Sequence, residues 1–175
     1  MSFGGDPIAV SEGVRLRPID QSDMKLLRQW KNANRERFFH RHEISAVQQG
    51  EWYVAFRDRP DDYMFIVESN GIRFGCMGYR IDGEYIDFYN VIRGRTDIGA
   101  GLMHLAFLKL VAEACIQYPG RQCRVLVLAD NPAIFWYRKC GFVETSSEGD
   151  HVVMFRGNAG RQLDQMPHQA IRQTR

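Results

Sequence analysis

The chain has 175 residues, 45% of them hydrophobic and 25% charged, and its formal net charge is +2. That length supports one domain with a hydrophobic core, but not two. The excess positive charge lies in the C-terminal stretch, which contains three arginines, Arg161, Arg172 and Arg175, and one acidic residue, Asp164. The rest of the chain therefore has equal numbers of positive and negative charges. A balanced body argues against nucleic-acid binding. No apolar run is long enough to span a membrane, and residues 1–10 lack the basic start and apolar core of a secretory signal.

Four cysteines are present, at Cys76, Cys115, Cys123 and Cys140, and none of them forms a Cys-x-x-Cys pair. Such spacing favours reduced thiols over a disulfide framework or a metal site. We therefore expect a cytoplasmic protein that binds no metal, no membrane and no nucleic acid.

The first half of the chain alternates short strands with two helices. A flexible lead-in is expected at residues 1–13, a folded domain at 14–156 and an arginine-containing tail at 157–175. A strand is predicted at 14–19, followed by a helix that Asp20 caps and a second helix that Ser45 caps. Residues 34–44 form a basic, aromatic loop between these helices. Strands at 63–67 and 72–81 flank a turn at 69–71, and another strand follows at 85–92.

The second half continues with a helix at about 99–117, a strand at 124–129, a helix at 132–140 and a hairpin of 142–145 with 152–155. The long helix is predicted to turn these residues toward the sheet: Leu102, Leu105, Ala106, Leu108, Val111 and Cys115. The whole order predicts one α/β domain, with helices on both faces of a mixed, mostly antiparallel sheet.

The segment VIRGRTDIGAGLMHLAFLKLV, from Val91 to Val111, is a strand end, a glycine-bearing turn and a helix start. The first turn of a helix has unpaired N–H groups and a partial positive charge, so it suits a phosphate. Small residues let an anion approach the backbone closely. The residues expected to face the phosphate are Ile98, Gly99, Ala100, Gly101 and Leu102.

Two common phosphate patterns fail here. The dinucleotide fingerprint Gly-x-Gly-x-x-Gly/Ala starts at Gly99 and Gly101 but meets His104. The nucleotide P-loop spacing fits Gly94 and Gly99, but Ala100 follows in place of lysine. A third pattern, Gln/Arg-x-x-Gly-x-Gly/Ala placed five residues after a valine, fits except at its first position. The alternative to a phosphate site is a helix start that is rich in glycine but binds no ligand.

A second motif, DNPAIFWYRKCGF at 130–142, follows the apolar run Arg124–Ala129. It resembles the Asn-x-x-Ala-x-x-x-Tyr-x-x-x-Gly-Phe segment of the Gcn5-related N-acetyltransferases (GNAT), whose acyl-CoA loop has the third pattern. Asp130 stands at the asparagine position of that segment, with Asn131 beside it. The resemblance covers roughly residues 14–156 and implies the single-domain acyl-CoA N-acyltransferase fold.

This resemblance implies acetyl-CoA as co-substrate and direct transfer of the acetyl group to a primary amine in a ternary complex. The pantetheine would bind the backbone of Val91, Ile92 and Arg93, and it would contact Asp130 or Asn131. Asn131 is the chemical favourite, because an amide both donates and accepts hydrogen bonds. Tyr137 matches the family tyrosine that protonates the departing CoA sulfur. An ordinary half-buried helix tyrosine is the alternative for this residue.

The general base should project from the strand beside the acetyl group. Strict alternation puts Tyr85, Asp87, Tyr89 and Val91 on one face, so Asp87 is the first candidate and Glu84 the second. A β-bulge between the two carboxylates would reverse that preference. The alternative is that both carboxylates are only solvated strand residues and that the acceptor amine loses its proton through water.

The loop departs from the family at its first position, where Thr96 and then Asp97 stand instead of Arg or Gln. A carboxylate beside a pyrophosphate is unfavourable unless it points to solvent. We hypothesise that Arg95 supplies the missing positive charge.

The loop between the first two helices lines the acceptor side in this family. Its arginines, aromatic rings and histidines suit an anionic acceptor with a flat group, such as a nucleotide-linked amino sugar. The residues concerned are Arg35, Arg37, Phe38, Phe39, His40, Arg41 and His42. A solvated loop is the plain alternative. The open alternatives for function are a protein N-terminal acetyltransferase of the ribosomal-protein type and a non-catalytic acyl-CoA-binding module. For assembly, a homodimer is one option.

Overall fold

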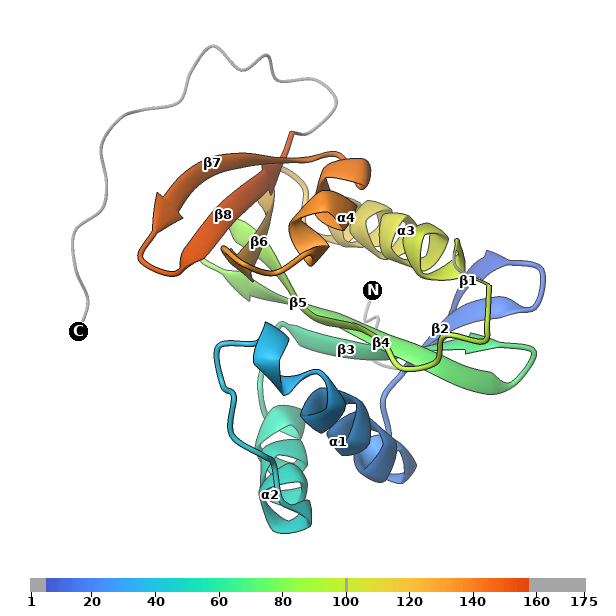
Figure 1. The fold of residues 1–175 in the computed structure, drawn as a ribbon. Helices are drawn as coiled ribbons and strands as arrows, with labels where there is room; N and C mark the ends of the chain where they lie inside the picture. Colours follow the sequence, from blue (N-terminus) through green and yellow to red (C-terminus); the bar gives the residue numbers. More distant parts are fainter. Residues whose placement is uncertain (1–5, 100, 158–175) are drawn as a thin grey trace.

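The computed structural model describes residues 6–99 and 101–157, and these form one sheet with helices on both faces (Figure 1). The strands are β1 (Ile8–Ser11), β2 (Val14–Pro18), β3 (Asp62–Ser69), β4 (Ile72–Asp82), β5 (Tyr85–Arg93), β6 (Gln122–Leu128), β7 (Phe142–Glu148) and β8 (His151–Arg156). The helices are α1 (Met24–Ala33), α2 (Ala46–Arg57), α3 (Leu102–Gln117) and α4 (Ala133–Lys139), with 3₁₀ turns at Gln21–Asp23 and Arg35–Arg37.

The sheet has the strand order β1-β2-β3-β4-β5-β6-β8-β7. Every neighbouring pair is antiparallel except β5 and β6, which are parallel. The predicted mixed, mostly antiparallel sheet is therefore confirmed. The parallel pair is short, since only Tyr85–Phe88 of β5 pairs with Gln122–Val125 of β6. Beyond Phe88 and Val125, the two strands no longer pair.

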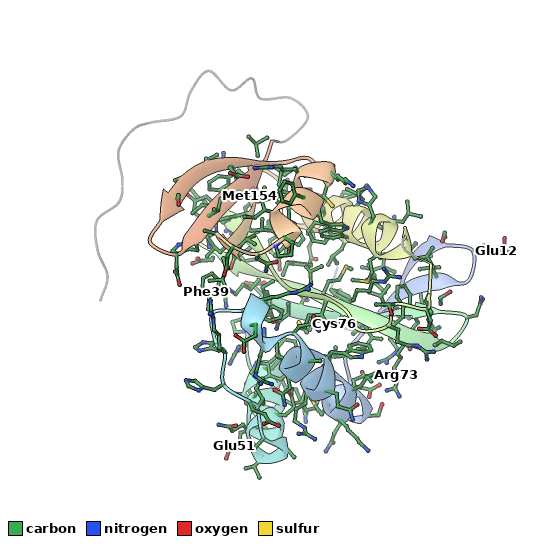
Figure 2. All side chains as sticks on the ribbon, viewed as in Figure 1. Glu12, Phe39, Glu51, Arg73, Cys76 and Met154 are labelled. Carbon is green, nitrogen blue, oxygen red and sulfur yellow. The ribbon has the colours of Figure 1, made fainter. Side chains whose placement is uncertain are left out.

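Two hydrophobic cores lie on the two faces of the sheet. The first core packs α3 and α4 against one face and includes Phe107, Phe142 and Met154. The second core packs α1 and α2 against the other face, around Trp30 and Cys76. Figure 1 shows the two helix pairs on opposite sides of the strands, and Figure 2 labels Met154 and Cys76 in their separate layers. None of the helices in the described part of the chain is long and apolar enough to cross a membrane.

Local sequence signals set most of the boundaries. The Ser45 side chain accepts from the Gln48 N–H, so the predicted cap of α2 is present. The Asp20 side chain accepts from the Ser22 N–H and caps the 3₁₀ turn Gln21–Asp23 that leads into α1, whose own N-cap, Asp23, makes no side-chain cap bond. In the predicted β3–β4 turn, Asn70 and Gly71 have φ of 49° and 79°. Two consecutive residues with positive φ make the tight hairpin turn whose twist matches the strands.

Two expectations need correction. Residues 8–11, inside the expected lead-in, form β1, which pairs with β2; the strand is too short for its alternation to stand out. Leu105, predicted to face the sheet, is 48% exposed, whereas Met103, Phe107, Leu110 and Ala114 are buried. The sequence of α3 is apolar nearly all round, so the pattern alone could not select the buried face.

Candidate functional site

A β-bulge interrupts β5 next to the point where β5 and β6 diverge. Cys76 of β4 pairs with Ile92, but Gly78 pairs with Tyr89, so β5 has one residue more than β4 over this interval. Asn90 absorbs the extra residue with a φ of 50°. Asn is one of the few residues that adopt this left-handed conformation at modest cost.

The bulge changes which side chains share a face. Tyr89 and Ile92 pack in the second core, on the α1 side, whereas Val91 packs against the first core. The predicted shared face of Asp87, Tyr89 and Val91 is therefore wrong for Val91. The bulge lies beyond both candidate bases, so it does not reverse the parity between Glu84 and Asp87.

Arg93 braces the loop between β5 and α3. Its guanidinium donates to the backbone carbonyls of Arg95 (3.1 Å), Thr96 (2.9 Å) and Ile98 (2.6 Å). Three carbonyls of the loop are thus drawn toward one side chain. A cation that binds carbonyls in this way fixes the loop backbone.

The glycines of this loop serve different purposes. A Cβ on Gly94 would lie 2.0 Å from the Trp30 ring, so packing against α1 requires a glycine there. A Cβ on Gly101 would meet no atom within 4 Å, and one on Gly99 would meet only the Leu102 side chain, at 3.6 Å. Packing within the described chain therefore does not explain Gly99 and Gly101, and their role beside an anion stays a prediction. Ala100 lies outside the described residues.

Helix α3 begins directly after these glycines. The N–H of Leu105 donates to the carbonyl of Gly101 (3.1 Å), and the N–H of Leu102 donates to the carbonyl of Gly99 (3.2 Å). The N–H groups that precede Leu105 have no place in the α-helical ladder. Ile98 and Leu102 pack against the first core, which anchors the loop on either side of the glycines.

Arg95 and Asp97 form an exposed ion pair with two hydrogen bonds, at 3.0 and 2.6 Å. The Arg95 guanidinium lowers the pKa of the Asp97 carboxyl, and Asp97 raises the pKa of Arg95. The Asp97 carboxylate, which departs from the family pattern, is thus paired with Arg95 and faces solvent. Thr96 is also exposed.

Tyr137 of α4 lies with its ring in the first core. The ring makes edge contacts with Phe107 of α3 and Phe142 of β7, at 5.7 and 5.9 Å between centroids. Burial raises the pKa of the phenol, which therefore keeps its proton at neutral pH. Within residues 6–99 and 101–157 the hydroxyl has no hydrogen-bond partner, and its oxygen is not sealed from solvent. A protonated, unengaged hydroxyl can donate to an incoming group.

Asn131 joins α4 to the 34–44 loop. Its side-chain oxygen accepts from the Ala133 N–H (2.9 Å), and its side-chain nitrogen donates to the carbonyl of Arg37 (3.0 Å). Asp130 is exposed beside it. Of the two predicted pantetheine contacts, Asn131 is thus already engaged, whereas the Asp130 carboxylate has no hydrogen-bond or ion-pair partner among residues 6–99 and 101–157.

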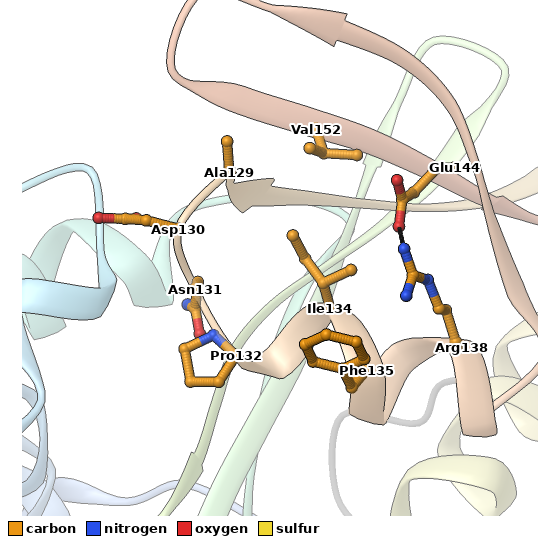
Figure 3. Close-up of a pocket in the computed structure, with 9 residues that line it drawn as sticks. All are labelled: Ala129, Asp130, Asn131, Pro132, Ile134, Phe135, Arg138, Glu144 and Val152. Carbon is orange, nitrogen blue, oxygen red and sulfur yellow. Dashed lines mark hydrogen bonds and ion pairs between the residues drawn. The ribbon is translucent and has the colours of Figure 1, made fainter.

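A hollow lies beside the same turn, whose residues form part of its wall (Figure 3). Its walls come from the β6–α4 connection, α4, β7 and β8: Ala129, Asp130, Asn131, Pro132, Ile134, Phe135, Arg138, Glu144 and Val152. The Asp130 side chain points away from Ile134 and Phe135, and Arg138 pairs with Glu144 across the hollow. Neither Tyr137 nor the loop after β5 lines it.

Asp87 is buried between two arginines. Its oxygens accept from Arg80 of β4 (3.0 Å) and Arg124 of β6 (3.1 Å), and its side chain is 3% exposed. Arg124 continues the network to Asp82 (2.7 Å). Both oxygens of Asp87 are thus committed to the sheet. Glu84 lies in the exposed turn before β5, at the end of the strand away from the bulge.

The 34–44 loop crosses from α1 to the far half of the sheet. The Phe38 ring lies under the Lys31 ammonium, with Nζ 3.2 Å from its centroid, and Phe39 contacts His151 of β8 at 5.7 Å. Asn32 ties the loop end by two hydrogen bonds to the backbone of Ile44. The remaining predicted acceptor residues are exposed: Arg35, Arg37, His40, Arg41 and His42.

Lys31 was not predicted as part of the site. Its ammonium donates to the Asn90 side chain at the bulge, with Nζ 2.5 Å from Oδ1. Burial lowers the pKa of Lys31 to about 8. The sequence shows only a lysine on the half-buried helix face, and no local pattern reveals its partner.

Comparisons place this geometry among known folds. The chain matches no protein-family model and no curated protein sequence. A solved structure of RimL, a ribosomal L7/L12 α-N-protein acetyltransferase in complex with coenzyme A, aligns with a TM-score of 0.70 and 16% identity, over 86% of this chain and 96% of that one.

Two further structures align similarly. A spermidine N-acetyltransferase from Vibrio cholerae, in complex with CoA and spermine, aligns with a TM-score of 0.67 and 18% identity, over 83% of this chain and 94% of that one. FdhC, a nucleotide-linked sugar GNAT, aligns with a TM-score of 0.70 and 16% identity, over 89% and 90%. The chain therefore has the fold of the Gcn5-related N-acetyltransferases.

Proposed function

We propose that this chain is an N-acetyltransferase that moves an acetyl group from acetyl-CoA directly to a primary amine. The observation that carries the proposal is the divergence of β5 from β6 directly before the bulge. Ile92 and Arg93 pair with β4 on one side only, so the backbone edge of Val91–Arg93 toward β6 is not part of a ladder. Pantetheine amides can bind such an edge as an added strand.

The pyrophosphate would then reach the start of α3. The backbone N–H groups of Ile98, Gly99 and Gly101 lie at a helix N-terminus, where an anion is favoured, whereas that of Leu102 already donates to the carbonyl of Gly99. Arg93 holds the loop carbonyls on its own side, which favours exposure of the N–H groups on the other. Arg95 contributes positive charge and neutralises Asp97. Asp130 and Asn131 border the pantetheine from the start of α4.

Tyr137 is assigned the proton transfer to the leaving group. The acceptor nitrogen attacks the thioester carbonyl, the carbon–sulfur bond breaks, and the thiolate takes the phenolic proton. The raised pKa of Tyr137 ensures that the proton is present, and its hydroxyl is not engaged elsewhere in the described chain.

We assign Asp87 a structural role and not the role of general base. A carboxylate whose two oxygens accept hydrogen bonds from two guanidinium groups in the sheet is not free to move toward a substrate. Glu84, in the turn, is too far along β5 from the bulge. The acceptor ammonium therefore transfers its proton to water or to a different group.

For the acceptor we propose a small amine that carries phosphate, such as a nucleotide-linked amino sugar. Arg35, Arg37 and Arg41 on the 34–44 loop are suited to phosphate oxygens, and the half-exposed Phe39 ring is suited to a base. The loop contacts both the β6–α4 connection, at Asn131, and β8, at His151, so an acceptor beneath it would lie close to the divergence of β5 and β6.

The test is a thiol-release assay with acetyl-CoA and two acceptor panels, amino-sugar nucleotides and peptides with free N-termini. The proposal predicts CoA release with amino-sugar nucleotides and with few peptides. Release with peptides alone would instead support a protein N-terminal acetyltransferase. Acetyl-CoA binding without release for any amine would support a non-catalytic module.

A further inference from the structure

The side chain of Lys31 lies where the proposed donor and acceptor sites meet. Its Nζ is 2.5 Å from Oδ1 of Asn90, the bulge residue directly before Val91–Arg93. On the other side Nζ lies 3.2 Å from the centroid of Phe38, in the 34–44 loop. The ammonium is thus placed between the strand assigned to pantetheine and the loop assigned to the acceptor.

Lys31 also lacks the usual partner of a buried ammonium. Within residues 6–99 and 101–157, no carboxylate lies within ion-pair distance of its Nζ, and its one hydrogen-bond acceptor is the neutral amide of Asn90. Structural lysines in protein interiors are normally paired with an acid. A largely buried amine without a counter-charge is instead suited to lose and regain a proton.

We propose that Lys31 accepts the proton of the acceptor ammonium before acetyl transfer. This inference rests on the proposed N-acetyltransferase function and supplies the base that Asp87 and Glu84 do not. Its geometric basis is the position of Nζ between Asn90 and Phe38.

The proton balance closes without a further reactant. Neutral Lys31 takes one proton from the acceptor ammonium, and the freed nitrogen lone pair forms the bond to the acetyl carbon. The carbon–sulfur bond breaks, and the sulfur takes the Tyr137 proton. The phenolate then takes the second proton from the acetylated nitrogen, and Lys31 releases its proton to water.

The surroundings of Lys31 make its charged form less favourable than that of a free lysine. Burial lowers its pKa to about 8. The titratable group acting on it is the Cys76 thiol of β4, whose own pKa burial raises to about 12, so the thiol stays protonated and neutral. Asn90 from β5 and Phe38 from the loop carry no charge. The active form is the deprotonated amine, so the rate should rise with pH through about 8.

The experiment compares wild type with Lys31→Arg, because arginine keeps the charge and length but cannot lose its proton. With saturating acetyl-CoA and the best acceptor, Lys31→Arg should lower kcat on the order of 100-fold and remove the rise near pH 8. The KM for acetyl-CoA should stay unchanged. Lys25→Arg, on the exposed face of the same helix, is the matched control and should leave both kcat and the pH profile unchanged.

Two further measurements test the role of Lys31 even if the arginine of Lys31→Arg does not fit between Asn90 and Phe38. Lys31→Gln removes the amine without adding bulk and should show the same loss of kcat. Titration of ¹³C-labelled lysine side chains by NMR should show one resonance with a midpoint near pH 8, which is absent in Lys31→Gln.

The outcomes separate the inference from the function on which it rests. Full kcat in Lys31→Arg or Lys31→Gln, or a Lys31 midpoint above pH 10 as for a free lysine, overturns the role of Lys31 and leaves the N-acetyltransferase proposal intact. Failure of wild type to release CoA with every amine overturns the proposed function and this inference with it.

Discussion

The guanidinium of Arg93 donates to the backbone carbonyl of Ile98 across 2.6 Å and thereby closes the loop that precedes α3. The same side chain also binds the carbonyl of Thr96. Arg93 thus acts on the backbone, which is the part of this loop expected to contact the pyrophosphate. Arg93 should therefore contribute to pyrophosphate binding both by its charge and by the conformation that it gives the loop.

Replacement of Arg93 should weaken acetyl-CoA binding. Arg93→Ala removes charge-assisted hydrogen bonds to three carbonyls, so we expect a loss of affinity of about tenfold or more. Arg93→Lys is the informative companion, because it keeps the charge but cannot bridge three carbonyls. Calorimetric titration should show both variants weakened, and an Arg93→Lys variant with wild-type affinity would contradict the bracing role.

The Arg95–Asp97 pair leads to a double-substitution test. Arg95→Ala should weaken acetyl-CoA binding severalfold, because it removes a positive charge and leaves Asp97 unpaired beside the phosphates. The loss should be larger at low salt, since both groups are exposed. Adding Asp97→Asn to Arg95→Ala should restore part of the affinity. An Arg95→Ala variant with unchanged affinity would show that Arg95 does not supply the missing charge of the loop.

Tyr137→Phe should separate chemistry from binding. The ring contacts with Phe107 and Phe142 remain, so the fold and the KM for acetyl-CoA should be preserved, while kcat falls on the order of 100-fold. Steady-state kinetics of CoA release provide the measurement. Tyr53→Phe on α2 is the matched control. Equal kcat in wild type and Tyr137→Phe would assign the proton transfer to another donor.

The four cysteines should differ in reactivity. The hydrogen bond from Cys123, 3.2 Å away, lowers the pKa of the Cys115 thiol to about 7, and Arg156 adds to the effect. Burial raises the pKa of Cys140 to about 11 and that of Cys76 to about 12. A lower thiol pKa gives more thiolate at neutral pH, and thiolate is the reactive form.

Iodoacetamide at pH 7.5 should therefore modify Cys115 first, as followed by peptide mass analysis over time. Cys123→Ser should slow this reaction by removing the thiol partner. Modification of Cys76 or Cys140 at the same rate as Cys115 would contradict the arrangement.

Elements defined by local chemistry were predictable from the sequence. Asp20 caps the 3₁₀ turn before α1 and Ser45 caps α2, each through its own side chain, and Asn70-Gly71 sets its turn through its own backbone preferences. The loop before α3 and the α4 segment could be located because their motifs are contiguous in the chain.

Features that depend on packing were not predictable. Asn90 carries no glycine or proline signal, and its bulge follows from the pairing of β5 with β4, thirteen residues away at Met77. The arginines that hold Asp87 come from β4 and β6, so alternation alone made that carboxylate look available. The contact between Lys31 and Asn90 joins residues fifty-nine positions apart.

The proposed function requires that the divergence of β5 and β6, with the loop before α3, forms an acyl-CoA site. Calorimetric titration of the chain with acetyl-CoA, beside ATP and NAD, measures whether it does. We expect micromolar binding of acetyl-CoA and no response to the other two ligands. Absence of acetyl-CoA binding, or equal binding of ATP or NAD, would contradict it.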